Sequence, residues 1–273
     1  MVELGGVSRP SFYRFEEEAT PKVDRDMDLR DAIQRIALKW PSYGRPRITA
    51  ELKRQGWKVG PNRVRRIMRE DNLLCVRKRK FVVTTDSNHG GKVYPNLKST
   101  MDLTGINQLW VADITYIRLE AEFVYLAVVI DAFSRRVIGW ALDRTLANDL
   151  PIQALRLALE QRQPAPGLVH HSDRGSQYAS HDYTDLLKAW GCQISMSHKA
   201  SPWENGGCES WMKTLKHEEV FRQEYRNLAE ARSCLQRFIE KVYNQQRLHS
   251  ALGYRPPAEF EQALLTQAQA SAG

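Results

Sequence analysis

The sequence predicts an α/β fold in which a mixed five-stranded sheet with flanking helices follows an N-terminal, helical and basic region. The order of elements after residue 106 is strand, strand, strand, helix, strand, helix, strand, helix, which combines antiparallel and parallel strands in one sheet. Positive charge is concentrated ahead of that sheet. Residues 44–80 contain 13 Lys and Arg against 3 Asp and Glu, a net +10, whereas the whole 273-residue chain carries +8.

Composition excludes several classes of protein. With 42% hydrophobic and 26% charged residues, the chain is typical of globular domains and unlike disordered ones. The longest apolar run, Phe123–Ile130, has eight residues, whereas a membrane span needs about 20. The N-terminus lacks the pattern of a secretory signal. Because no CxxC or zinc-like spacing occurs, we expect free thiols at all four cysteines: Cys75, Cys192, Cys208 and Cys234.

The first 80 residues are predicted to fold into helices. Residues 1–40 form an N-terminal helical segment in this prediction, because apolar residues recur at a helical period over 28–40. Residues 41–80 form a basic, helix-turn-helix-like module of two short helices separated by a break that contains Gly and Pro. Residues 81–106 are polar and without periodicity, which indicates a linker.

The second helix of this module combines an apolar stripe with a basic face. The stripe comprises Val64, Ile67 and Met68. The opposite face carries Arg65, Arg66 and Arg69. A buried stripe behind a row of guanidinium groups suits a helix that lies against DNA, so we expect these arginines to bind DNA, with Arg45 and Arg47 from the first helix. A solvated charged face is the alternative interpretation, and the local charge of +10 favours DNA.

Residues 107–225 are predicted to form an α/β core, and residues 226–273 a helical C-terminal extension. Runs rich in Val, Ile, Tyr and Trp indicate strands over 109–118, 122–130, 136–142, 168–171 and 192–196. Helical periodicity covers 149–163, 182–190 and the stretch from 201 to about 248.

Three carboxylates occupy distinctive places in that order. Asp113 lies inside the first strand of the core, where a charge is costly unless it has a partner. Asp173 follows the next parallel strand, and ligand sites in such sheets gather at the carboxyl ends of strands. Glu209 lies on the helix after the last strand, with 35 residues between it and Asp173.

This arrangement resembles the DDE recombinases, which include retroviral integrases and insertion-sequence transposases. The segments Gln108–Tyr116, His171–Tyr178 and Trp203–Ser210 are similar to the three catalytic motifs of OrfB-type insertion-sequence transposases. Tyr43–Leu52 and Tyr243–Tyr254 resemble an N-terminal and a C-terminal motif of the same family. Five motifs in the family's order, spread over roughly residues 40–260, make the resemblance specific.

The resemblance implies an RNase H-like fold and a DDE-type polynucleotidyl transferase. It implies that Asp113, Asp173 and Glu209 are catalytic and hold two divalent metal ions, Mg²⁺ or Mn²⁺, with Asp113 bridging both. Carboxylate oxygens are the ligands that Mg²⁺ prefers, and two metals suit an in-line displacement at phosphorus. The implied reaction is cleavage at the ends of an insertion sequence, then attack of a 3′-OH on a phosphodiester.

Two basic residues and two histidines lie close to these carboxylates in the sequence. Lys213 and Lys216 share a helical face with Glu209, and we expect them to contact the DNA backbone. The alternative for Lys213 is an ion pair with Glu209 within the helix. His170 and His171 are expected to pack or to orient the loop before Asp173 rather than to bind metal.

The implied partners are double-stranded DNA, as element ends and as target, and further copies of the chain in at least a dimer. In this family the core is often fused to an upstream reading frame that carries a helix-turn-helix, and residues 6–14 resemble that junction. A bacterial cytoplasmic location at the nucleoid, with no membrane partner, is therefore expected.

Two rival functions remain. The first is a non-catalytic DNA-binding regulator, or an accessory subunit of a longer transposase fusion. The second is a general RNase H-like nuclease, which explains the carboxylates but neither Tyr43–Leu52 nor Tyr243–Tyr254.

Overall fold

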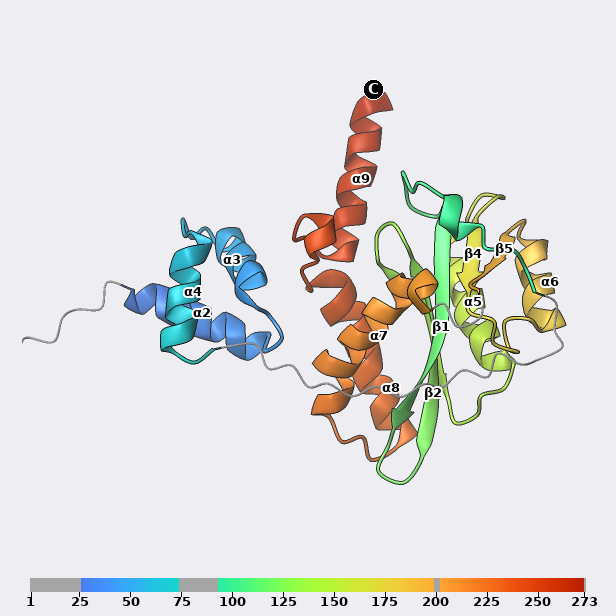
Figure 1. Ribbon diagram of the computed structural model, residues 1–273, viewed down its shortest axis with the longest axis horizontal. Helices are drawn as coiled ribbons and strands as arrows, with labels where there is room; N and C mark the ends of the chain where they lie inside the picture. The colour runs from blue at the N-terminus through green and yellow to red at the C-terminus, as the bar shows by residue number, and fades with distance from the viewer. Residues whose placement is uncertain (1–25, 74–92, 199–201, 273) are drawn as a thin grey trace, which may run out of the picture.

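A computed structural model describes residues 26–73, 93–198 and 202–272 of the chain. Figure 1 shows the N-terminal helices beside a sheet that carries helices on both of its faces. The mixed α/β architecture predicted from the sequence is therefore confirmed. Some predictions concern residues outside the described ranges: the thiol of Cys75, the basic run 76–80 and the junction-like segment 6–14.

The three N-terminal helices, α2 (Met27–Lys39), α3 (Arg45–Arg54) and α4 (Pro61–Glu70), enclose a small core of their own. Proline in the first turn of α3 and of α4 favours helix initiation there, and an extended glycine precedes each helix. The stripe predicted on α4 is fully inside this core, which includes Ile33, Ile48, Leu52, Val64 and Ile67. Burial of these side chains holds α2 against the other two helices.

The sheet contains five strands in the spatial order β3-β2-β1-β4-β5. Their bounds are β1 Leu109–Arg118, β2 Phe123–Asp131, β3 Val137–Asp143, β4 Val169–Ser172 and β5 Gln193–Met196. The first three are antiparallel neighbours, and β4 pairs in parallel with both β1 and β5. The strand that contains Asp113 is thus central, and β4 delivers Asp173 beside it.

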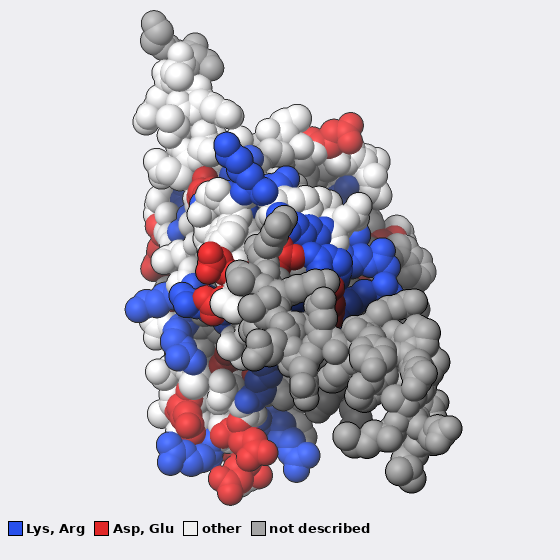
Figure 2. Space-filling model, turned by 90° about the vertical axis from the view of Figure 1, so that its left-hand side faces the viewer, with Lys and Arg blue, Asp and Glu red and all other residues white. Residues whose placement is uncertain are grey.

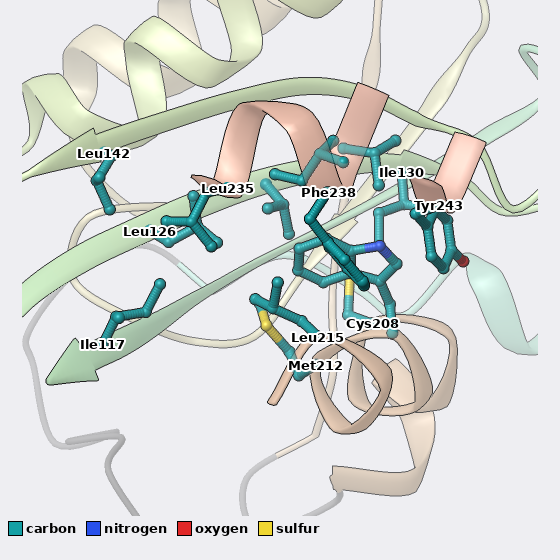
Figure 3. Packing of buried hydrophobic residues seen from close by; sticks show 14 of the residues in the cluster. Ile117, Leu126, Ile130, Leu142, Cys208, Met212, Leu215, Leu235, Phe238 and Tyr243 are labelled. Carbon is teal, nitrogen blue, oxygen red and sulfur yellow. The ribbon is translucent and has the colours of Figure 1, made fainter. Parts of the chain in front are cut away.

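Helices α5 (Asp149–Arg162) and α6 (His181–Ala189) cover one face of the sheet. Contact with α5 is close at Gly139 on β3, where an added Cβ would lie 2.1 Å from the Ala154 carbonyl oxygen. The other face is covered by α7 (Gly206–Glu218). Figure 3 shows Cys208, Met212 and Leu215 of α7 beside apolar side chains from the strands.

The helical stretch expected from 201 to about 248 is interrupted. A 3₁₀ turn, η2 (Pro202–Asn205), leads into α7, and a second, η3 (Val220–Arg222), follows it. The next helix, α8 (Leu228–Gln236), begins where the Asn227 side chain accepts a hydrogen bond from the Glu230 N–H at 3.0 Å. This cap ends the extended segment and restarts the helix.

The chain after α8 packs against the same sheet and its helices. A π-helical segment, η4 (Arg237–Tyr243), packs Phe238 into the core of the α7 face. The last helix, α9 (Pro257–Ala272), is held by Glu261, whose buried carboxylate pairs with Arg136 and Arg162 at 2.6 and 2.7 Å. None of the helices in the described ranges is long and apolar enough to cross a membrane.

Candidate active site and nucleic-acid interface

Asp113 and Asp173 meet in one cavity, as their positions in the sequence predict. The cavity has a volume of about 180 Å³ and lies where β1 passes the loop after β4. Each carboxylate is oriented by a nearby backbone N–H: Asp113 Oδ1 accepts from Ile114 at 2.8 Å, and Asp173 Oδ1 accepts from Gly175 at 2.9 Å. The tight turn after Asp173 thus holds its carboxylate toward the central strand.

The two carboxylates interact unfavourably through their charges. Burial, followed by the nearby charge of Asp173, raises the pKa of Asp113 to about 7. Glu209 adds a smaller repulsion, and the ammonium of Lys216 acts in the opposite direction on the same pKa. The cavity therefore concentrates negative charge that a cation would compensate.

Glu209 lies on α7, the helix that follows the last strand, but its side chain is engaged outside the cavity. Gly207, two residues before Glu209, faces β1, where an added Cβ would make an ordinary contact with the Val111 side chain at 3.7 Å. Within the described residues, the lining of the cavity does not include Glu209, whose carboxylate pairs with Lys213 Nζ at 2.8 Å. In the same ranges, no three His, Cys, Asp or Glu side chains are close enough together to hold a metal ion.

The two candidate lysines of α7 differ in environment. Lys213 forms the i, i+4 ion pair with Glu209 that was the alternative to DNA contact. The Lys216 ammonium lies 5.0 Å from the centre of the Tyr116 ring and is half-buried. Burial lowers the pKa of Lys216, and the charge of Asp113 partly offsets that effect. Lys216 is thus the nearer of the two to the carboxylate cavity.

The five candidate arginines of the N-terminal helices fall into two groups. Arg45, Arg65 and Arg69 are exposed. Arg66 also reaches solvent but is ion-paired with Asp26 and Glu70, while Arg47 donates from Nε to the Leu248 carbonyl at 3.1 Å. Figure 2, which looks toward this side of the molecule, shows Lys and Arg side chains gathered across its middle with acidic ones among them.

Neighbouring histidines and tryptophans serve the packing of the core. His170 contacts the Tyr183 hydroxyl at 3.0 Å and His171 contacts Ser195 Oγ at 2.9 Å, both in buried surroundings. Burial lowers their pKa values to about 3 and about 4, so both rings are neutral near pH 7. Trp211 is 2% exposed in the core beneath α7.

The structure also brings together basic residues from four distant segments. Lys98, Arg135 and Arg247 lie with Arg47 around a second cavity between the N-terminal helices and α7. The only sequence signal among Lys98, Arg135 and Arg247 was the position of Arg247 inside the Tyr243–Tyr254 motif. Local periodicity carries no information on such a grouping, because its members are far apart along the chain.

Three family models match parts of the chain. Residues 104–202 and 190–257 each match a model described as an integrase core domain. Residues 24–81 match a model described as an HTH-like domain.

Three bacterial relatives cover most of the chain. An insertion element IS600 uncharacterized 31 kDa protein of Shigella sonnei is 37% identical over 265 residues, which are 96% of this chain and 97% of the relative. Transposase InsF for insertion sequence IS3A of Escherichia coli strain K12 is 37% identical over 96% of this chain and 92% of its own length. The transposase for insertion sequence element IS904 of Lactococcus lactis is 36% identical over 80% and 87%.

Solved integrase structures are more distant. The catalytic core domain of HTLV-2 integrase in complex with magnesium is 16% identical, with a TM-score of 0.42 over 57% of this chain and 97% of that chain. The catalytic core domain of BIV integrase is 19% identical, with a TM-score of 0.42 over 60% and 99%.

Proposed function

The chain belongs to the insertion-sequence transposases that carry an integrase core domain, and on that premise we propose that it cuts DNA at the ends of its element and joins them to target DNA. Its general role is DNA transposition. In the proposed joining step, a 3′-OH at the element end attacks a target phosphodiester. The new P–O bond forms as the bond to the leaving 3′ oxygen breaks, so no covalent link between protein and DNA is needed.

The observation that carries the proposal is the convergence of Asp113 and Asp173 in one cavity. Asp113, whose pKa is raised by burial and by the charge of Asp173, and Asp173 itself share one cavity, and a divalent cation, which prefers such oxygen ligands, would stabilise both carboxylates. The donor set therefore fits Mg²⁺ or Mn²⁺. Asp113, Asp173 and Glu209 would hold two such ions, which when bound activate an attacking oxygen and stabilise a leaving one.

Glu209 has two competing partners in this proposal. In the described structure it neutralises Lys213. If the Glu209 carboxylate left Lys213 to bind a metal ion, the Lys213 ammonium would become available to a DNA phosphate. On the same face of α7, Glu209 would then serve as a metal ligand and Lys213 as a phosphate contact.

DNA is proposed to lie across the N-terminal helices and the carboxylate cavity. Arg45, Arg65 and Arg69 are exposed and able to reach phosphates, while Lys216 would meet the backbone beside Asp113. We further propose an assembly of at least two copies on DNA, since the two ends of the element must be held side by side for the reaction. Its DNA substrate would place this reaction at the bacterial nucleoid.

A strand-transfer assay tests the proposal. Labelled DNA that carries the flanking element ends is incubated with wild type, Asp113→Asn, Asp173→Asn or Glu209→Gln in Mg²⁺ or Mn²⁺. Joined products from wild type alone are expected, with DNA binding retained by all four proteins. Joined products from any of the three variants would contradict the assigned roles. Absence of products from wild type, with binding intact, would favour the accessory-subunit function.

A further inference from the structure

A cavity of about 280 Å³ lies where the N-terminal helices, α7 and the C-terminal motif meet. It is distinct from the carboxylate cavity but lies on the same face of β1, because Val111 lines it and Asp113 is two residues further along the strand. Its polar lining includes Arg47, Lys98, Arg135, Ser210, Thr214 and Arg247.

The charge around this cavity is unbalanced. One carboxylate, that of Asp131, is among the lining groups, and backbone N–H groups of Ser134 and Asn107 already donate to its oxygens at 2.9 and 2.7 Å. The charge of Arg247 is neutralised by an ion pair with Glu218, which does not line the cavity. Among the described residues, neither Arg47 nor Arg135 has a carboxylate within ion-pair distance. Burial and then the charge of Arg247 lower the pKa of Arg47, which indicates that the two guanidinium groups repel each other.

Arg135 occupies an unusual backbone position. It lies in the turn between β2 and β3 with φ of +60°, a left-handed conformation that glycine adopts with less strain. Its charge acts on Tyr243 and His249, both of which line the cavity. The turn therefore directs an arginine toward the cavity at a position where local backbone geometry favours a residue without a side chain.

Further hydrogen-bond donors surround the same space. The indole N–H of Trp211, a lining residue, is buried and has no hydrogen-bond partner among the described residues. Ser210, which directly follows Glu209, contributes a hydroxyl group from α7, while the Thr214 hydroxyl already donates to the Ser210 carbonyl at 3.1 Å. Guanidinium, ammonium and hydroxyl donors around one space are the partners that the oxygens of a phosphate accept from.

We propose that this cavity binds a phosphate group, held chiefly by Arg135 and Arg47. Two sources have the required chemistry: a backbone phosphate of DNA and free inorganic phosphate. The DNA source rests on the function proposed above, whereas affinity for phosphate itself does not. A DNA phosphate here would connect the N-terminal helices to α7 next to Glu209, so the strand would be positioned by contacts from both parts of the chain.

The first experiment titrates the full chain with inorganic phosphate at constant ionic strength and follows binding by calorimetry. The variants are Arg135→Gln, Arg135→Lys and the matched control Arg156→Gln, which removes one exposed positive charge from α5 on the opposite face of the sheet. We expect at least tenfold weaker binding for Arg135→Gln, and near wild-type binding for Arg135→Lys and Arg156→Gln. Failure of wild type to bind phosphate, or an equal loss in the control, would overturn the proposal.

The second experiment identifies the source of the phosphate. Addition of a duplex carrying an element end should displace inorganic phosphate from wild type, and Arg135→Gln should lower the log–log salt slope of DNA binding by about 0.9, equivalent to one contact. Phosphate binding without displacement by DNA would instead assign the cavity to free phosphate. Neither measurement requires strand transfer, so loss of the proposed catalytic activity would leave this test intact.

Discussion

Arg247 and Glu218 are joined by two hydrogen bonds of 2.8 Å, and their side chains are only 5% and 8% exposed. Glu218 ends α7, the helix that carries Glu209. The residue after Arg247, Leu248, accepts a hydrogen bond at its carbonyl from Arg47 Nε of α3 and donates its own N–H to the Tyr43 hydroxyl at 2.8 Å. The ion pair thus connects the predicted DNA-binding module with α7, the helix that carries Glu209.

Arg247→Met is expected to lower the free energy of unfolding by about 3–5 kcal/mol, because it leaves the buried carboxylate of Glu218 without a counter-charge. Urea denaturation measures this loss. The double variant Arg247→Met/Glu218→Leu should recover most of it, since no unpaired charge remains. A single variant within 1 kcal/mol of wild type would show that the pair has little structural weight.

Gly139→Ala is expected to destabilise the fold by about 3 kcal/mol, because the added methyl group would collide with the Ala154 carbonyl where α5 crosses β3. Gly60→Ala is the control, since no atom lies within 4 Å of its added Cβ. Thermal unfolding of both variants compares the two sites. Equal melting temperatures would mean that α5 can move away from the sheet at little cost.

Asp113→Asn is expected to abolish strand transfer and yet raise stability in metal-free buffer at pH 8, by an amount on the order of 2 kcal/mol. The physical reason is that it removes a buried carboxylate charge and the repulsion of that charge by Asp173. Added Mg²⁺ should stabilise wild type by preferential binding to the folded state and have a smaller effect on the variant. Denaturation with EDTA or Mg²⁺ measures both effects, and a destabilised variant would contradict the account.

Stability is expected to fall below pH 6.5 through His249. Burial, followed by the charges of Arg247, Arg47 and Arg135, lowers its pKa from 6.5 to about 2. Between these values the unfolded chain binds one more proton than the folded protein, so folding weakens as pH falls. This stability is fully present above pH 6.5.

The loss attributable to His249 is about 2 kcal/mol between pH 6.5 and 4.5. Denaturation of wild type and His249→Gln at several pH values measures this loss. Between pH 6.5 and 4.5 the free energy of unfolding of wild type should fall by about 2 kcal/mol more than that of the variant. The control is His181→Gln, which replaces an exposed histidine on α6. Parallel slopes for wild type and His249→Gln would refute the assignment.

The strands and their order were predictable because local periodicity reports which faces are buried. The strand predicted over 109–118 has those bounds, and the structure places it, with Asp113 in its interior, at the centre of the sheet. The break after α7 was not predicted, because the helical pattern continues through residues 219–227 while Tyr225 is drawn into the core beneath the sheet. Packing of one aromatic residue there outweighs local helix propensity.

The sequence by itself determined the order of elements, the meeting of Asp113 with Asp173 and the basic character of α4, because each depends on short-range pattern and on how strands pair. Only the tertiary structure decided which side chains are already engaged. Arg66 pairs with Asp26, and Arg47 donates a hydrogen bond to the Leu248 carbonyl. Arg135 and Arg247 likewise line one cavity only because of the tertiary fold. Such partnerships depend on distances between segments remote in sequence, which are established when the cores pack and are not encoded in local periodicity.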